Sequence, residues 1–145
     1  MAELSPQAIA DFVRAGLLEQ DRATQVLGMQ FIDMTPGCAS LRMTVREDML
    51  NGHRTCHGGM IAALADSAFA FACNSSNELT VASGFSIDFF APGRLGDVLT
   101  ACCTELYRGN RTGIYDVQVV NQSGERVAVF RGRSYAVKGR AAIGD

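Results

Sequence analysis

The chain has 145 residues, a length that suits one domain and is enough for a sizeable hydrophobic core. Its 13 basic and 15 acidic residues nearly cancel, which removes the electrostatic attraction on which nucleic-acid binding depends. Asp66 interrupts the longest apolar stretch, residues 60–73, well short of the ~20 residues that a membrane-spanning helix needs, and the first residues lack the basic start of a signal peptide. We therefore expect a cytoplasmic protein that binds neither nucleic acid nor membrane.

The cysteines do not have the pattern of a disulfide framework or a zinc site. There are five, an odd number, and no two of them are spaced as C-x-x-C. Such cysteines commonly serve as small buried apolar side chains in a reducing compartment. We expect this role for Cys38, Cys56, Cys73, Cys102 and Cys103. We also expect the protein to bind neither a metal ion nor a cofactor.

The beginning of the chain predicts two helical segments. Ser5 followed by Pro6 is a typical helix start, because serine caps the first turn and proline fits the first helical position. Apolar residues at helical spacing extend this helix from residue 6 to about 19. Gly28 ends a second, shorter stretch, so the N-terminal helical region covers about 6–27.

A change of period then predicts a β-hairpin. Apolar and polar residues alternate over 41–46, which is typical of a half-buried strand. The Thr-Pro-Gly turn at 35–37 joins it to a preceding strand at 29–34. A glycine-containing loop, 49–56, follows.

The next segment, residues 57–73, predicts the central helix. It is rich in alanine, contains no proline, and favours helix after its two glycines. Between residues 60 and 73 only Asp66 and Ser67 are polar. A helix that is apolar on nearly every face is expected to be buried.

The remainder of the chain predicts four strands. One shows alternation over 83–89, a second covers about 95–107, and a third alternates over 115–119. The turn at 121–124 leads to the last strand, which begins at about 127.

The resulting order is helix, two strands, long helix and four strands. Strands on both sides of one central helix indicate an α+β protein with a mostly antiparallel sheet. A buried helix needs a curved sheet around it, and that shape is the hotdog fold. We expect a single domain over 1–145, with its core at about 28–137.

Asp66 is the residue that most needs an explanation. A carboxylate within an apolar helix is costly unless it is paired, protonated or solvated by a cleft. In a purely structural role, Asp66 would accept hydrogen bonds from the backbone of a neighbouring element. In a functional role, it would be a general base or a nucleophile whose surroundings tune its pKa.

Gly58 and Gly59 lie where the central helix begins. The free backbone N–H groups and the positive end of the helix dipole point outward there, and glycine lets a ligand oxygen approach them. The same arrangement forms an oxyanion hole for a thioester carbonyl. The pair taken alone is better explained by a tight turn into the helix.

The spacing of these residues adds information. Gly59 and Asp66 are seven residues apart, almost two helical turns, so they share a face but lie about 10 Å apart along the axis. That separation is too long for both to act on one carbonyl within one helix. If both are catalytic, Asp66 comes from a second subunit whose helix runs antiparallel, and the sites lie at a dimer interface.

Three polar residues precede the central helix. Asn51 is a candidate for holding the nucleophilic water or the thioester. His57 either orients the loop by bonding to backbone groups or takes part in proton transfer. We expect His53 to lie on the loop surface.

Several motifs resemble the phenylacetic-acid degradation thioesterases (PaaI) of the hotdog superfamily. The main one is LNGHRTCHGGMIAALADSAFA at 50–70. SIDFFAPGR at 86–94, RTGIYDV at 111–117, VNQ at 120–122 and VFRG at 129–132 look like the same family, so that the resemblance covers roughly 27–137. The H-G-G-x(6)-D core marks the wider superfamily, and the flanking residues point to this branch.

The resemblance implies a homotetramer of two hotdog dimers that hydrolyses an acyl-CoA to the acid and free CoA. It implies that Asp66 activates water or attacks directly, and that the amide of Gly58 or Gly59 polarises the thioester carbonyl. Asn51 would help to place the reacting groups, and Ser86 would lie near the water. Related pathways suggest an aryl or hydroxyaryl acyl group such as phenylacetyl or hydroxyphenylacetyl.

The CoA moiety has its own candidate residues. Arg108, Asn110 and Arg111 lie in a predicted turn that is able to meet CoA phosphates, although an ordinary solvated turn explains each one equally well. Arg94 and the basic residues of 131–140 are weaker candidates. Met60, Phe69, Phe85 and Phe89 are equally explained as walls of an aromatic pocket or as core residues.

Two other functions compete with the thioesterase. One is a hydratase or dehydratase on the same fold, which needs a histidine close to a carboxylate. His57 and Asp66 are nine residues apart and meet only across an antiparallel dimer. The other is a non-catalytic acyl-CoA-binding module, which leaves Asp66 unexplained and tolerates Asp66→Asn.

Overall fold

The computed structural model describes residues 2–144 and begins with two short helices, α1 (Pro6–Gln20) and α2 (Arg22–Val26). Ser5 caps α1, because its hydroxyl accepts a hydrogen bond from the N–H of Ala8 at 3.1 Å. Asp21 caps α2 by accepting from the N–H of Thr24 at 3.0 Å. The predicted helix start at Pro6 is confirmed.

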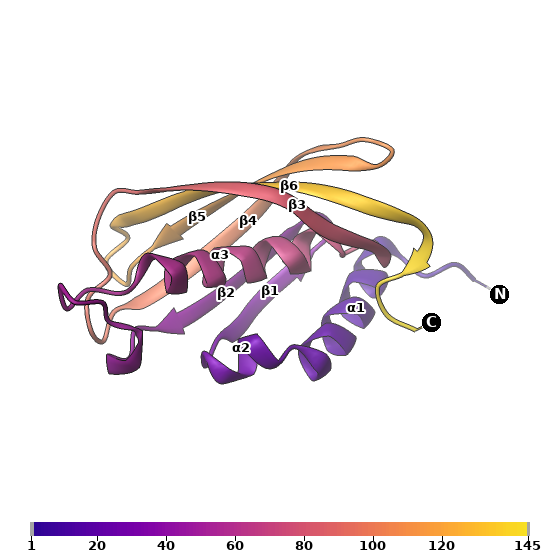
Figure 1. Cartoon of the computed structure of the whole chain (residues 1–145). Coiled ribbons are helices and arrows are strands. Elements are labelled where there is room, and N and C mark those ends of the chain that lie inside the picture. The colour runs from indigo at the N-terminus through magenta and orange to yellow at the C-terminus, as the bar shows by residue number, and fades with distance from the viewer. Residues whose placement is uncertain (1, 145) are drawn as a thin grey trace.

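A single six-stranded sheet contains all the strands, in the spatial order β1-β2-β4-β5-β6-β3 (Figure 1). Every neighbouring pair is antiparallel, and the sheet curves around helix α3 (Gly58–Cys73). The predicted α+β class with an antiparallel sheet is confirmed. The strands are β1 (Gln30–Thr35), β2 (Cys38–Thr44), β3 (Glu78–Phe89), β4 (Val98–Arg108), β5 (Thr112–Val120) and β6 (Arg126–Ala141), and a 3₁₀ turn, Glu47–Met49, precedes α3.

Helix α3 packs its large side chains into the hollow of the sheet. Phe69 is fully buried, with its ring 5.5 Å from that of Tyr115 and 5.8 Å from that of Phe130, centroid to centroid. Gly132 lies beneath Phe69, where an added Cβ would be 2.7 Å from the ring. The missing side chain at Gly132 therefore lets β6 pass directly under the helix.

The opposite face of α3 is not covered by the chain, contrary to the prediction of a helix buried on nearly every side. This face carries only small or polar side chains, and none of them is fully buried. Apart from the adjacent Ala62 and Ala63, three or four residues separate successive members, so they form one stripe along the helix. The stripe consists of Gly59, Ala62, Ala63, Asp66 and Ala70.

Two strands are longer than their patterns predicted. β3 begins at Glu78 rather than near 83, and β6 continues to Ala141. The basic residues of 131–140, treated as a tail in the sequence, therefore belong to a strand paired with β3 and β5. Their alternation is hidden because the buried positions between them are the small residues Gly132, Ser134 and Ala136.

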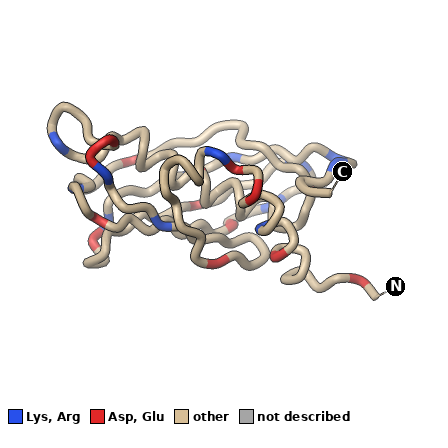
Figure 2. Tube along the Cα trace, turned by 90° about the horizontal axis from the view of Figure 1, so that it is seen from below, with Lys and Arg blue, Asp and Glu red and all other residues tan. Residues whose placement is uncertain are grey.

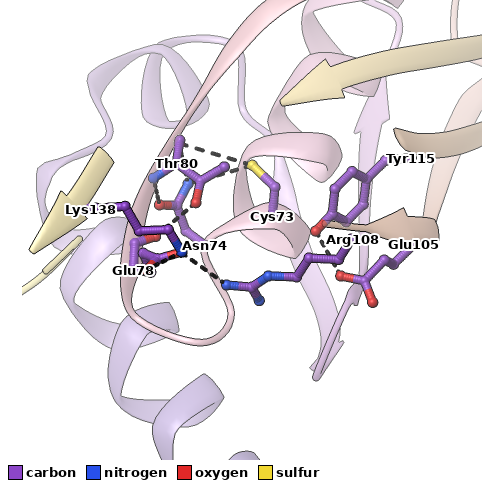
Figure 3. Close-up of polar contacts among 8 residues, drawn as sticks. All are labelled: Cys73, Asn74, Glu78, Thr80, Glu105, Arg108, Tyr115 and Lys138. Atoms are coloured by element: carbon purple, nitrogen blue, oxygen red, sulfur yellow. Dashed lines mark hydrogen bonds and ion pairs between the residues drawn. The ribbon is translucent and has the colours of Figure 1, made fainter. Parts of the chain in front are cut away.

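The far end of α3 is tied to the start of β3 by Asn74 (Figure 3). Its amide nitrogen donates to the carbonyls of Ala70 and Thr80, each at 2.9 Å. Its amide oxygen accepts from the N–H of Thr80, also at 2.9 Å. These three bonds fix where the chain leaves the helix and enters the sheet.

All five cysteines are free thiols. Cys56, Cys73 and Cys103 are buried, in line with the predicted role, whereas Cys38 is only partly buried and Cys102 is exposed. Basic and acidic residues are scattered over the trace rather than gathered on one face (Figure 2). Within residues 2–144, no helix is both long and apolar enough to cross a membrane.

Candidate active site

The loop before α3 is built around the side chain of Asn51. Its oxygen accepts from the N–H groups of His53, at 2.9 Å, and Thr55, at 3.2 Å. Its nitrogen donates to the hydroxyl of Thr55 at 3.1 Å. Asn51 thus holds the 51–55 turn together, and His53 is exposed as expected.

His57 is the N-cap of α3, and its Nδ1 accepts a hydrogen bond from the N–H of Gly59 at 3.0 Å. The N–H groups of Met60 and Ile61 donate to the carbonyl of His57, at 2.9 and 3.3 Å. The N–H of Gly58 has no hydrogen-bond partner among residues 2–144. Of the two amides that the sequence offered, only that of Gly58 is therefore free for a ligand.

Phe89 lies over Gly58, although the two residues are far apart in the sequence. A Cβ added at Gly58 would be 3.0 Å from Cζ of Phe89. The glycine therefore makes room for an aromatic ring from the end of β3, not simply for a ligand. Sequence reasoning missed this contact, because nothing local in the sequence reports it.

An open pocket of about 390 Å³ lies at this end of α3. Its wall includes Asn51, Gly58, Phe89, Phe90 and Pro92. Cys56 also faces it, but burial raises the pKa of this thiol to about 11, so the sulfur stays protonated and unreactive at neutral pH. A carbonyl bound in the pocket would meet the free amide of Gly58 and the positive end of the helix dipole.

Asp66 lies eight residues farther along α3, on its open stripe. Its side chain is partly buried, and no hydrogen bond or ion pair reaches it from the part of the chain that the structure describes. Burial raises the pKa of this carboxyl above its usual value of 3.8. The backbone hydrogen bonds expected of a structural aspartate are thus missing, and the carboxylate is available for proton transfer or nucleophilic attack.

The chain does not bring Asp66 to its own Gly58 amide. At ~1.5 Å per residue the two lie about 12 Å apart along the helix. Both residues of the expected catalytic pair are accessible, but within one chain they are too far apart to act on the same carbonyl. Asp66 and His57 are also separated along the helix, so they cannot form an acid–base pair within one chain.

Ser86 is not near either half of the site. It pairs with Arg131 and lies with Asp88, Asp116 and Arg131 in a groove on the outer face of the sheet. Phe85, Ile87 and Phe89 face the helix side of the sheet, so the alternation along this part of β3 places Ser86 on the opposite face. Ser83 is the extra residue of a bulge between Ala82 and Gly84, and its hydroxyl donates to the carbonyl of Arg133 at 3.1 Å.

Of the residues proposed for the CoA moiety, Arg108 and Arg111 lie near Cys73 at the other end of α3, and Arg108 is drawn in Figure 3. Arg108 is paired with Glu78 at 3.4 Å, and Lys138 approaches the same carboxylate at 3.3 Å. Asn110 and Arg111 are exposed in the β4–β5 turn. Arg94 is exposed in a separate turn, where its N–H donates to Asp97 at 2.9 Å.

The four apolar residues considered as pocket walls separate in the structure. Phe69 is a core residue, and Met60 is partly buried against the core. Phe85 is 43% exposed and stacks on Phe130 with centroids 4.6 Å apart. Only Phe89 lines the pocket at Gly58.

The residues described include no group of three or more His, Cys, Asp or Glu side chains placed to hold a metal ion.

Comparison with known proteins agrees with this chemistry. The model of the thioesterase superfamily matches residues 53–128. The acyl-coenzyme A thioesterase PaaI of Escherichia coli is 47% identical over 123 residues, which cover 85% of this chain and 88% of that protein.

Solved structures give the same result. The structure of the E. coli PaaI protein from the phenylacetic acid degradation operon superposes with a TM-score of 0.91 at 44% identity, covering 94% of this chain and 99% of that one. A Streptococcus mutans protein bound to acetyl CoA has a TM-score of 0.74 at 26% identity, covering 77% and 90%. The chain therefore belongs to the thioesterase superfamily, adopts its hotdog fold, and is a member of the PaaI family within it.

Proposed function

We propose that this protein is an acyl-CoA thioesterase that hydrolyses aryl-type CoA thioesters to the free acid and CoA. The observation that carries the proposal is Asp66, a partly buried carboxylate on the open face of α3 that receives no hydrogen bond or ion pair from residues 2–144. A structural carboxylate at such a position would be hydrogen-bonded. The E. coli relative's name and structure point to the same activity.

The chemistry follows from the two halves of the site. The thioester carbonyl binds at the Gly58 N–H, which stabilises the negative oxygen formed on attack. Asp66 either removes a proton from the attacking water or attacks the carbonyl carbon itself. In both routes the carbon–sulfur bond breaks and the CoA thiol leaves with a proton. Attack by water gives the free acid directly, whereas attack by Asp66 gives a mixed anhydride that water then hydrolyses to the free acid and the restored carboxylate.

A second subunit completes each site. Two α3 helices running antiparallel would bring the partner's Asp66 level with Gly58, and the stripe of small residues lets them approach closely. The outer edge of β3 has no strand beside it among residues 2–144, and Val81 and Phe85 are 46% and 43% exposed there. An exposed apolar edge next to a bare helix face supports an interface of this kind.

The same arrangement supports the CoA assignment. Because the partner's Asp66 would be level with Gly58, the C-terminal end of the partner's α3 would project beyond Gly58. The partner's Arg108, Asn110 and Arg111 would then flank the mouth of the pocket, where phosphates of the bound CoA arrive. Arg108 would exchange its pairing with Glu78 for a phosphate.

The acyl group is proposed to be phenylacetyl or hydroxyphenylacetyl-like. Phe89 and Phe90 form an aromatic wall beside the Gly58 amide, and the E. coli relative comes from a phenylacetic acid degradation operon. We further propose a cytoplasmic homotetramer of two such dimers. Five free thiols suit a reducing compartment.

The test is thiol release from a panel of aryl- and fatty-acyl-CoAs, with wild type and Asp66→Asn compared under the same conditions. We expect wild type to favour aryl esters and Asp66→Asn to lose about 10²–10⁴-fold in kcat. Asp116→Asn is the control, because it removes an aspartate on the outer face that pairs with Arg131. A hydratase would consume enoyl esters without releasing thiol, and a binding module would bind esters equally well with either residue at 66.

A further inference from the structure

His57 is an unusual helix cap, and the structure shows what it does. N-caps are most often Ser, Thr, Asp or Asn, and this chain uses Ser5 and Asp21 at its two other α-helices. At α3 the cap is an imidazole nitrogen, 3.0 Å from the Gly59 nitrogen. Because Nδ1 accepts this bond it carries no proton, and the proton of the neutral ring lies on Nε2.

The cap acts on a weak point of the helix. Two consecutive glycines have more conformational freedom than any other pair, so the first turn of α3 is intrinsically prone to fray. Two contacts oppose this: the His57 ring, 3.2 Å from where a Cβ of Gly59 would lie, and the Phe89 ring over Gly58. The N–H of Gly59 is bonded to His57, and the ring of Phe89 packs against Gly58. The N–H of Gly58 therefore remains available for a ligand, and its direction is fixed.

We propose that His57 is a positioning residue for the oxyanion amide: it caps Gly59 with an uncharged nitrogen and so keeps the Gly58 N–H free and correctly aimed. The inference rests on the proposed thioesterase function. It differs from direct proton transfer by His57, since the ring acts through the backbone of the first helical turn rather than on the substrate.

The choice of an uncharged cap follows from the reaction. An aspartate at position 57 would cap the helix well, but its negative charge would lie beside the oxygen that becomes negative during attack. At α2, where no such charge develops, the chain does use an aspartate. An uncharged acceptor provides the cap without opposing the oxyanion.

Three variants separate capping from charge: His57→Ala, His57→Asn and His57→Asp. Each is measured for kcat and KM with an aryl-CoA and for its melting temperature. We expect His57→Asn to stay within about threefold of wild type in kcat, since asparagine is a neutral and efficient cap. His57→Ala should lose roughly tenfold, and His57→Asp roughly 10²-fold, close to the loss of an oxyanion donor. KM should change little in all three.

Melting temperature and a matched control complete the design. The melting temperature of His57→Asp should be no lower than that of His57→Asn. The lower kcat of His57→Asp would then not result from a loss of stability. Ser5→Ala removes an equivalent side-chain cap from α1 and should lower the melting temperature by a few degrees while leaving kcat unchanged.

The outcomes distinguish the possible failures. If His57→Asp is as active as His57→Asn, the positioning role is wrong. If His57→Asn is as impaired as His57→Ala, the imidazole acts directly in the chemistry and the inference is also wrong. Absence of thiol release by wild type overturns the proposed function itself, and the inference with it.

Discussion

At the scale of single residues, Asp66 shows how the helix environment sets the chemistry of a carboxylate. Its neighbours along the stripe are glycine and alanine, which offer no hydrogen-bonding side chains. Burial raises its pKa, and no cation or donor among residues 2–144 offsets this. The ionised form that catalysis needs is therefore maintained at a cost to folding.

This cost predicts an unusual effect of Asp66→Asn on stability. A pKa raised above 3.8 in the folded state means that the protonated carboxyl favours folding and the ionised carboxylate opposes it. The penalty is absent at acid pH and fully present once the pH exceeds the raised pKa. We expect Asp66→Asn to melt higher than wild type at pH 7, and the difference to shrink as the pH falls through that pKa.

Thermal melts at several pH values, at one protein concentration, measure this effect. Asp88→Asn removes an exposed carboxylate of the outer sheet face and should follow wild type throughout. A lower melting temperature for Asp66→Asn at neutral pH would show that Asp66 has a stabilising partner, and would remove the argument for an unpaired catalytic base.

At the scale of elements, the junction from α3 to β3 depends on one amide side chain. Asn74 is 7% exposed, and two of its three hydrogen bonds join the carbonyl and the N–H of Thr80. Removing the side chain takes the partner from the buried N–H of Thr80 and leaves its carbonyl only the weak contact with the thiol of Cys73, which costs more than the bonds themselves contribute.

Asn74→Ala should therefore lower the free energy of unfolding by about 1–3 kcal/mol or more. Asn121 is a suitable control, because it makes similar bonds to Ser123 and Glu125 in the exposed β5–β6 turn. Asn121→Ala should cost clearly less in the same urea titration. Equal losses would mean that burial does not govern the junction.

Elements with large apolar residues in regular alternation were predictable from sequence. β2 and β5 are examples, as is α1 with its serine cap and N-terminal proline. The second half of β6 was not, because its buried side is Gly132, Ser134 and Ala136, which do not stand out as apolar. The outward face of Ser86 follows from the alternation over 85–89, whereas its expected place near the attacking water came from the family resemblance alone.

The candidate site was predictable only in part. Asp66, Gly58 and His57 belong to one continuous segment, so spacing along a helix located them correctly relative to each other. Phe89 is 31 positions from Gly58, and its contact depends on where β3 ends in the sheet. The choice of Gly58 over Gly59 required the orientation of the His57 ring, which composition does not give.

At the scale of the whole molecule, a single chain keeps the two halves of the proposed site apart. The open stripe of α3 and the free edge of β3 are the surfaces that would join them in a dimer, so changes on these surfaces should remove activity and assembly together.

Ala62→Arg tests it by placing a long cation in the middle of the stripe. We expect a monomer by sedimentation velocity, with thiol release reduced by at least about 10²-fold because neither half of the site retains its partner. Ala15→Arg makes the same exchange on the exposed side of α1 and should leave both measurements unchanged. An active monomeric Ala62→Arg would show that one chain is sufficient.

The strand order has a further consequence for how the protein is made. β3 has a single neighbour in the sheet, and that neighbour is β6. During synthesis from the N-terminus, β3 and the apolar side of α3 emerge while the strand that will pair with β3 is still untranslated. Until residues 126–141 have left the ribosome, the nascent chain therefore exposes an unpaired strand edge and an apolar helix face, both of which are prone to associate with other chains.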